Sequence, residues 1–316
     1  MYRCLSFSHS RKETSLDMGS SSITTNAAYA LCLWVDGSGT GSPPAPWKTV
    51  FYPVKTRDNP NFAVVLQNTE NTQQYALVIQ GTTNIWDAIL DFKINDPVSF
   101  PSISGAQIAN GASQGMANVL GLKDGAGQTM NQFLGSIDWS ASSLFLGGHS
   151  LGGTLASLMA PWASVSLFGQ KQPLAQLPPG IQAITFAPFA AGNQQFADFL
   201  NSQSNYQANF NENDAVPHVW ATAGPYSVPN MYALFPAPGP SPMPQDMQKQ
   251  VQDKLNGIPT GFSYVQTTGI SFAFPSEATS SWTAELSYQH NQAYDVQFGA
   301  GGGTTAKNLR VSTAKT

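Results

Sequence analysis

A serine between two glycines is the most informative chemical pattern in this chain, and it occurs twice. Gly111-Ala112-Ser113-Gln114-Gly115 and Gly148-His149-Ser150-Leu151-Gly152 both match Gly-x-Ser-x-Gly, the pattern of a nucleophile elbow. In such an elbow the serine occupies a tight strand-to-helix turn, where flanking side chains would collide with neighbouring backbone. The pattern is short, so its surroundings decide whether either serine is a nucleophile.

Those surroundings favour Ser150 over Ser113. Ser150 follows the apolar run Leu144-Phe145-Leu146 and precedes a segment with helical spacing of its apolar residues, which predicts a strand, a tight turn and a helix in that order. Ser113 follows no buried strand. We expect Ser150 to be the nucleophile, with the helix N-terminus favouring the negative charge that develops on the acyl oxygen. The alternative is a glycine-rich turn with an unreactive serine.

The sequence around Ser150 resembles the class 3 (fungal-type) lipases. Its elbow, GHSLGGTLA, is closely similar to theirs, and five further segments follow in the family's order: VIQGT at 78–82, PVSFP at 97–101, AITFA at 183–187, NDAVP at 213–217 and HNQAY at 290–294. The resemblance covers about residues 49–294. It implies the α/β-hydrolase fold, a Ser-His-Asp triad, and hydrolysis of a carboxylic ester through an acyl-enzyme, with triacylglycerol as the expected substrate.

The base is sought among four histidines. His9 precedes the core, and His149 is too close to the nucleophile in sequence to turn back on it, which leaves His218 and His290. In this fold the chain order is nucleophile, acid, histidine. We expect His290, which lies well downstream where the family places its base. His218 stays the alternative, with a loop residue near the mouth of the site as its simpler interpretation.

The acid is expected at Asp214, which follows an expected strand at 206–210 and precedes Val216-Pro217. A carboxylate at the end of a strand can orient the imidazole and stabilise the imidazolium. An ordinary turn aspartate is the alternative. Among the other carboxylates after Ser150, Asp198 falls in an expected helix, and Asp246 and Asp253 fall in a polar insertion. The remaining ones are Glu212, Glu277, Glu285 and Asp295.

Two further features are predicted around the nucleophile. The oxyanion hole needs two backbone N–H donors, which we expect from Leu151 and from Thr82, whose hydroxyl could add a third. A helical lid is expected at about residues 83–98, with Trp86 and Ile89 on its apolar side, lying on the site in water and on lipid at an interface. An ordinary surface helix is the alternative.

Composition restricts the function classes. Only 10% of the 316 residues are charged and the net charge is −4, so nothing favours binding of nucleic acid. No metal site, cofactor or transmembrane segment is expected; the partners are a lipid or other ester substrate and transient contact with a lipid interface. The polar, charge-poor composition slightly favours a secreted enzyme, although the start of the chain lacks the apolar core of a signal peptide. Pairing of Cys4 with Cys32 and the oligomeric state stay open.

Strand-like and helical segments alternate along the second half of the chain, which predicts a mixed, mainly parallel sheet with helices on both faces. Strands are expected at 49–54, 62–67, 75–80, 144–146, 181–186, 206–210, 262–266 and 270–274, and a last helix at 282–298. We expect one catalytic domain over residues 1–316, with a proline-rich cap or solvated loop at about 225–259 and a flexible tail at about 299–316.

Two departures from the family pattern stand out. Ala109 replaces a histidine that class 3 lipases usually carry after the lid, and the 225–259 insertion lengthens the connection between acid and histidine. Neither touches the expected triad. A non-lipolytic esterase, of the feruloyl or small-ester type, and a non-catalytic ligand-binding relative are the alternative functions.

Overall fold

The computed structural model describes residues 22–37, 39–56, 60–82, 84–235, 242–277 and 281–299. The expected tail lies outside them from residue 300 onward, and so do Cys4 and His9. Cys32 is buried and its thiol is free.

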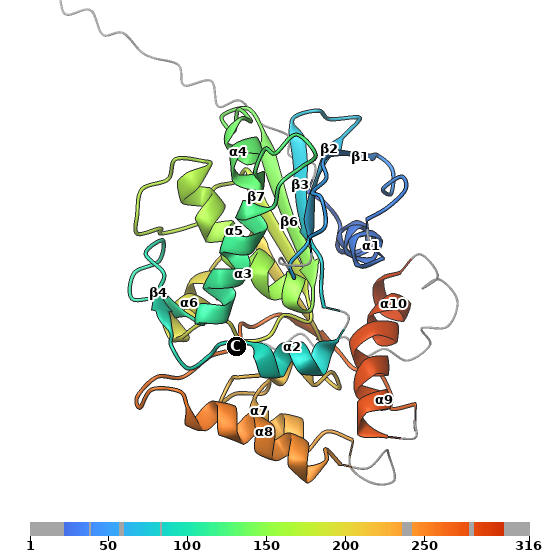
Figure 1. Cartoon of the computed structure of the whole chain (residues 1–316), viewed down its shortest axis with the longest axis vertical. Coiled ribbons are helices and arrows are strands. Elements are labelled where there is room, and N and C mark those ends of the chain that lie inside the picture. The colour runs from blue at the N-terminus through green and yellow to red at the C-terminus, as the bar shows by residue number, and fades with distance from the viewer. Residues whose placement is uncertain are drawn as a thin grey trace, which may run out of the picture.

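A seven-stranded sheet forms the centre of the molecule, with its strands in the order β1-β2-β3-β6-β7-β8-β9 (Figure 1). The first three strands pair antiparallel, and every pairing from β3 onward is parallel. This is the mixed, mainly parallel sheet that the sequence predicts. The strands are β1 (Trp47–Phe51), β2 (Ala63–Asn68), β3 (Gln74–Ile79), β6 (Ser143–His149), β7 (Ile181–Phe186), β8 (Tyr206–Asn211) and β9 (Ile270–Phe272); β4 (Val98–Ser99) and β5 (Gln107–Ile108) form a separate small sheet.

Helices cover both faces of the large sheet (Figure 1). One face carries α3 (Asn110–Gly121), α4 (Met130–Gly135), α5 (Leu151–Ser166) and α6 (Gln194–Asn201); the other carries α1 (Thr25–Asp36) and α10 (Ala293–Phe298). The central strands are apolar along most of their length because parallel strands are covered on both sides. In β3, Leu77 and Ile79 point into the larger core and Ala76 and Val78 into the smaller one.

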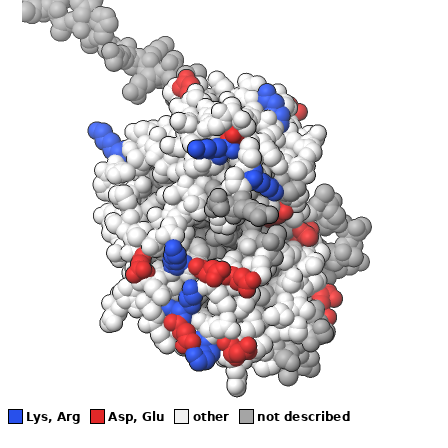
Figure 2. Space-filling model, viewed as in Figure 1, with Lys and Arg blue, Asp and Glu red and all other residues white. Residues whose placement is uncertain are grey.

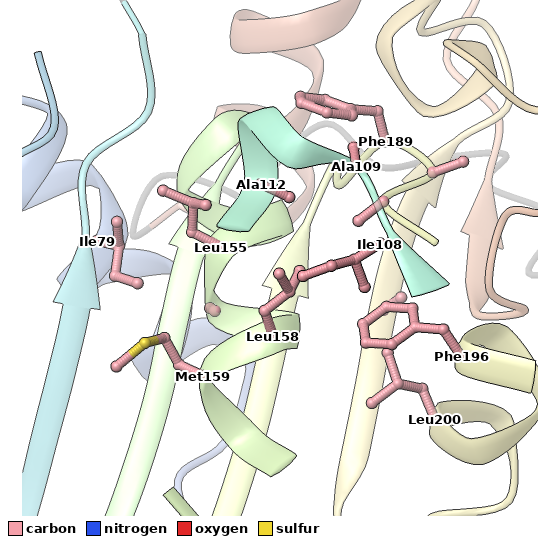
Figure 3. Packing of buried hydrophobic residues seen from close by; sticks show 14 of the residues in the cluster. Ile79, Ile108, Ala109, Ala112, Leu155, Leu158, Met159, Phe189, Phe196 and Leu200 are labelled. Atoms are coloured by element: carbon pink, nitrogen blue, oxygen red, sulfur yellow. The ribbon is translucent and has the colours of Figure 1, made fainter. Parts of the chain in front are cut away.

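The larger core holds α5 firmly against the sheet. Leu155, Leu158 and Met159 lie on the side of this helix that faces the larger core, where Leu155 lies between Ile79 of β3 and Ala112 of α3 (Figure 3). All five side chains are fully buried. Since α5 begins directly after Ser150, this packing fixes the position of the elbow relative to β3.

Four short helices form a further layer beyond the carboxyl ends of the parallel strands, in the lower part of Figure 1. They are α2 (Ile85–Asp91), α7 (Val228–Tyr232), α8 (Gln245–Asn256) and α9 (Trp282–Ser287). The 225–259 insertion provides α7 and α8, and its Val228, Met231 and Val251 side chains are buried in the larger core. Its described part is therefore packed on the protein and is not a solvated loop.

One sequence-based expectation about the last quarter of the chain is wrong. The strand expected at 262–266 does not form: Tyr264 and Val265 make only isolated bridges, to Ala221 and Gly192, and the Tyr264 hydroxyl donates to the Ile94 carbonyl at 2.6 Å. The helix expected at 282–298 forms over those bounds, and its middle part, η2 (Tyr288–Gln292) between α9 and α10, is a π-helix.

The charged side chains visible in Figure 2 are few, and both signs are interspersed over that face. Within the described ranges no helix is long and apolar enough to cross a membrane. The same ranges contain no cluster of three or more His, Cys, Asp or Glu side chains that could hold a metal ion.

Candidate active site

Ser150 occupies a strained turn between β6 and α5. Its backbone has φ 58° and ψ −128°, a conformation that a non-glycine residue adopts only where the surrounding structure enforces it. A Cβ atom on Gly148 would lie 2.2 Å from the backbone carbon of Gly152, and one on Gly152 would lie 2.2 Å from the Ile79 carbonyl oxygen. The two glycines of the motif are therefore required by backbone contact, as expected of a nucleophile elbow. Ser113, in contrast, lies inside α3.

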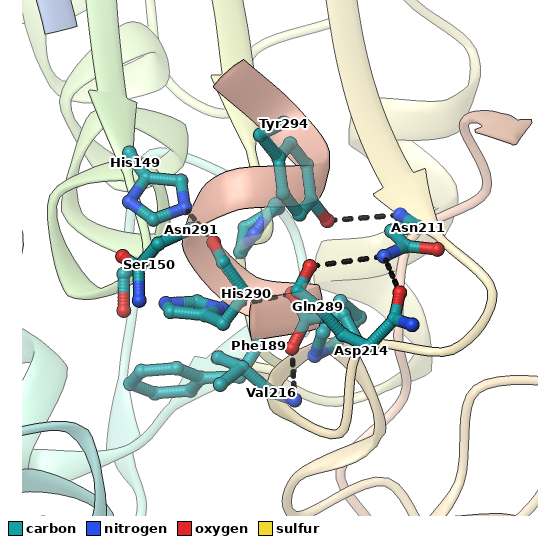
Figure 4. A network of polar contacts seen from close by, with 12 residues as sticks. His149, Ser150, Phe189, Asn211, Asp214, Val216, Gln289, His290, Asn291 and Tyr294 are labelled. Atoms are coloured by element: carbon teal, nitrogen blue, oxygen red, sulfur yellow. Dashed lines mark hydrogen bonds and ion pairs between the residues drawn. The ribbon is translucent and has the colours of Figure 1, made fainter. Parts of the chain in front are cut away.

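The structure brings Asp214 and His290 together. Asp214 follows β8, and its Oδ2 lies 2.8 Å from Nδ1 of His290 in η2 (Figure 4). Both side chains are buried, with 0% and 1% exposure. The other carboxylate oxygen, Oδ1, accepts the backbone N–H of Val216 at 2.9 Å. The carboxylate is thus held at both oxygens and orients the imidazole ring.

The His290 ring has one nitrogen free for chemistry. Nε2 is buried and has no hydrogen-bond partner among the described residues, and the free edge of the ring faces Ser150 (Figure 4). Burial lowers the pKa of His290 below its usual value; Asp214 opposes this shift and His149 adds to it. A neutral ring that donates from Nδ1 to Asp214 presents a lone pair at Nε2, which is what a general base requires.

His218, the alternative base, takes no part in this arrangement. Its Nδ1 lies 3.3 Å from the Ser227 carbonyl oxygen, and its ring contacts Tyr226 edge-on. Burial lowers its pKa. No hydrogen bond joins it to Asp214 within the described residues.

The two expected oxyanion donors line one hollow of about 390 Å³. Leu151 is the first residue of α5, where backbone N–H groups have no partner within the helix. Thr82 follows Gly81, whose own N–H is already bound to Oδ1 of Asp36 at 2.8 Å. The Thr82 hydroxyl is 3.5 Å from the Asn84 carbonyl oxygen, so it is turned towards its own loop.

The family follows from sequence comparison. The family model described as "Lipase (class 3)" matches residues 76–223, a span that runs from β3 through the elbow to beyond Asp214. Residues 76–223 of the chain belong to the class 3 lipase family. The resemblance of its motifs to that family is thereby confirmed.

Solved structures agree on the fold of this lipase. The structure of M37 lipase shares 22% identity with it at a TM-score of 0.67, covering 80% of this chain and 78% of that one. This likeness shows the α/β-hydrolase fold. A triacylglycerol lipase from Penicillium expansum (18% identity, 81% and 80% coverage, TM-score 0.49) and the Rhizomucor miehei triacylglyceride lipase (19%, 79% and 76%, 0.48) also match. No curated protein sequence is similar enough to count as a relative.

Helix α2 of this lipase lies where the lid is expected, but its orientation differs from the expectation. Ile89 is buried, Trp86 packs edge-on against Trp282 of α9 with ring centroids 6.1 Å apart, and the helix contacts α8. Asp87 and Asp91 instead line the hollow that holds the oxyanion donors. The polar side of α2 therefore faces the hollow, because its apolar side is already covered by the layer of short helices.

One close neighbour of His290 escaped the sequence analysis. His149, set aside because it adjoins the nucleophile, contacts both Asp36 and the base. Its Nε2 lies 2.8 Å from the His290 carbonyl oxygen, and its Nδ1 lies 3.6 Å from Oδ2 of Asp36. Asp36 is 113 residues away in sequence (149 − 36), so no local pattern connects the two.

Proposed function

We propose that this protein is a triacylglycerol lipase that acts through Ser150, His290 and Asp214. One observation carries the proposal: the buried His290–Asp214 pair, 2.8 Å apart, turns the free edge of its imidazole towards a serine in an elbow conformation (Figure 4). Class 3 lipase membership supports an ester of a lipid as the substrate.

In the proposed reaction, His290 Nε2 removes the proton from Ser150 Oγ as this oxygen attacks the ester carbonyl carbon. The N–H groups of Leu151 and Thr82 donate to the oxyanion of the tetrahedral intermediate. His290 then returns the proton to the departing alcohol oxygen as the C–O bond breaks and the acyl-enzyme remains. Water, deprotonated by His290, attacks the acyl-enzyme, and the carboxylic acid leaves as Ser150 regains its proton.

We further propose that the chain is one catalytic domain with α2 as a lid and α7–α8 as a cap beside it. The contact between α2 and α8 and the burial of apolar side chains from both elements support a shared cover. On this proposal Trp86 and Ile89 belong to the lid, and the acyl chain reaches Ser150 when α2 moves.

A second candidate is a non-lipolytic esterase, which several polar side chains around the hollow support. Beside Thr82 and Leu151, carboxylate and amide side chains line it: Asn84, Asp87, Asp91, Gln114 and Asn118. These side chains would bind hydroxyl or other polar groups of an ester, and Ala88 and Phe92 add apolar lining to the same hollow.

Initial rates on a series of esters separate the two candidates. A lipase hydrolyses emulsified triacylglycerols of sixteen- to eighteen-carbon acids, and its rate rises when substrate passes its solubility limit. An esterase prefers dissolved two- to four-carbon or aromatic esters and shows no such rise. Labelling by a fluorophosphonate, located to the peptide containing Ser150, tests the mechanism; a protein that neither labels nor hydrolyses any ester refutes both candidates.

A further inference from the structure

A second carboxylate–imidazole pair lies directly behind the first. Asp36, at the C-terminal end of α1, faces His149, the last residue of β6. The same carboxylate accepts the Gly81 N–H with Oδ1 and faces His149 Nδ1 with Oδ2. His149 in turn contacts the His290 backbone through Nε2. One chain of contacts thus joins the segment before Thr82, the residue before Ser150 and the residue expected to be the base.

The two acceptors around His149 decide its protonation. The His290 carbonyl oxygen is only an acceptor, so the nitrogen 2.8 Å away, Nε2, carries a hydrogen. A neutral His149 would then turn a bare Nδ1 towards the Asp36 carboxylate, and two acceptors repel. The arrangement therefore favours an imidazolium. Burial of His149 disfavours the charged form, but Asp36, the charge of Asp214 and the contact with the His290 carbonyl together outweigh it, and the pKa of His149 is raised.

The His149 ring lies beside the His290 ring. The ring centroids of His149 and His290 are 4.5 Å apart with an interplanar angle of 36°. Four groups with titratable side chains face His290: Asp214 from the end of β8, His149 from β6, Asp36 from α1, and Tyr294 on its own helical run. Of these, His149 alone opposes a positive charge on His290, and Tyr294 is neutral because burial raises its pKa far above the usual value.

We propose that Asp36 and His149 are positioning residues, which hold the His290 backbone through its carbonyl oxygen and keep a positive charge beside its ring. The inference rests on the proposed role of His290 as base. The π-helix fits it, because such turns change the direction of backbone groups and occur often at functional sites. The consequence is a base that stays neutral to lower pH and an imidazolium that gives its proton readily to the departing alcohol.

The test compares pH profiles of kcat/KM on a dissolved short-chain ester. His149→Gln retains an N–H donor for the His290 carbonyl but removes the charge, so its acid limb is expected to move up by about 1 pH unit. Asp36→Asn retains the acceptor for the Gly81 N–H and makes His149 neutral, which raises the pKa of His290. It also removes the negative charge of Asp36, which lowers that pKa, so the acid limb is expected to move up by less than in His149→Gln. His218→Gln replaces another buried histidine, one whose pKa is lowered, and is expected to leave the limb unchanged.

The positioning role has its own comparison. His149→Ala removes the contact with the His290 carbonyl as well as the charge, and is expected to lose about tenfold in kcat at the plateau of the profile relative to His149→Gln. Equal plateaus would refute positioning. An acid limb of His149→Gln at or below the wild-type limb would refute the charge effect, whatever the plateau does.

A spectroscopic measurement keeps the inference testable without activity. Histidine ring titration by NMR is expected to show one residue, absent in His149→Gln, that titrates above about 6.5 in the wild type and below it in Asp36→Asn. A neutral His149 at pH 6 would overturn the inference. Wild-type protein that hydrolyses no ester would refute the proposed function instead, while leaving this titration interpretable.

Discussion

Replacement of Asp214 by asparagine tests the orientation of the base more sharply than removal of the side chain. The Val216 N–H donates to Oδ1 of Asp214, so an asparagine is expected to place its carbonyl oxygen there. Its amide nitrogen then faces His290 Nδ1, where Oδ2 now lies at 2.8 Å. An amide donor in that place selects the tautomer with hydrogen on Nε2, and this tautomer cannot accept the proton of Ser150.

Two effects set the size of the loss. An imidazolium and a carboxylate with charge centres about 4 Å apart attract by about 4 kcal/mol at an effective dielectric constant of about 20, and Asp214→Asn removes this stabilisation of the transition state. In addition, the tautomer of His290 that can accept the serine proton carries its hydrogen on Nδ1. This N–H would oppose the amide N–H of the asparagine, at a cost of about 1–3 kcal/mol. Since about 1.4 kcal/mol is tenfold in rate, kcat is expected to fall by about 10⁴-fold, with KM nearly unchanged.

The assay is the initial rate on a dissolved short-chain ester, with kcat and KM determined separately. Asp214→Ala removes the charge without adding the opposed donor, so it is expected to retain more activity than Asp214→Asn. Asp198→Asn, on the exposed side of α6, serves as the control and is expected to match the wild type. A loss below tenfold in Asp214→Asn, or a loss confined to KM, would show that Asp214 does not orient the base.

Four other outcomes are expected. Ser150→Ala loses at least about 10³-fold in kcat, whereas Ser113→Ala is near wild type; fluorophosphonate labelling of Ser113 would reverse that assignment. Because burial lowers the pKa of His290, kcat/KM is half-maximal below pH 6.5 and falls as the ring protonates, and an acid limb centred above pH 7 would contradict this. Thr82→Val lowers kcat less than about tenfold, because the hydroxyl faces Asn84 and only the N–H donates. Trp86→Ser weakens hydrolysis of emulsified long-chain ester and spares dissolved ester; equal losses would show that α2 is no lid.

Most of the sheet could be predicted because its strands are buried on both faces and therefore appear as apolar runs. The strand β7 begins and ends where the sequence predicts, and the helix expected after Ser150 forms as α5. The elbow was predictable for a related reason: the contacts around Gly148 and Gly152 admit no side chain, and this requirement is visible in the sequence.

The segments that failed depend on contacts that only the fold creates. The apolar run at 262–266 is typical of a strand, yet no strand lies beside it, and Tyr264 is held by the Ile94 carbonyl instead. Helix α7 starts with Val228-Pro229 inside a proline-rich stretch, where proline is accepted because the first turn needs no N–H donor. A helix forms within the segment expected to be a lid, but Trp282, on which its Trp86 packs, lies 196 residues further along the chain (282 − 86).

Trp282 also lies at one end of the helical run that carries the imidazole. It is the first residue of α9, and α9 continues directly into η2 and His290. Trp86 of α2 packs on this first residue, so an α2 that swings outward uncovers the start of the same run. Adsorption to an oil droplet would then affect proton transfer at the serine through this helical run, because Trp282, which contacts α2, and His290 both belong to it. A closed α2 would slow the chemical step as well as block access of the substrate.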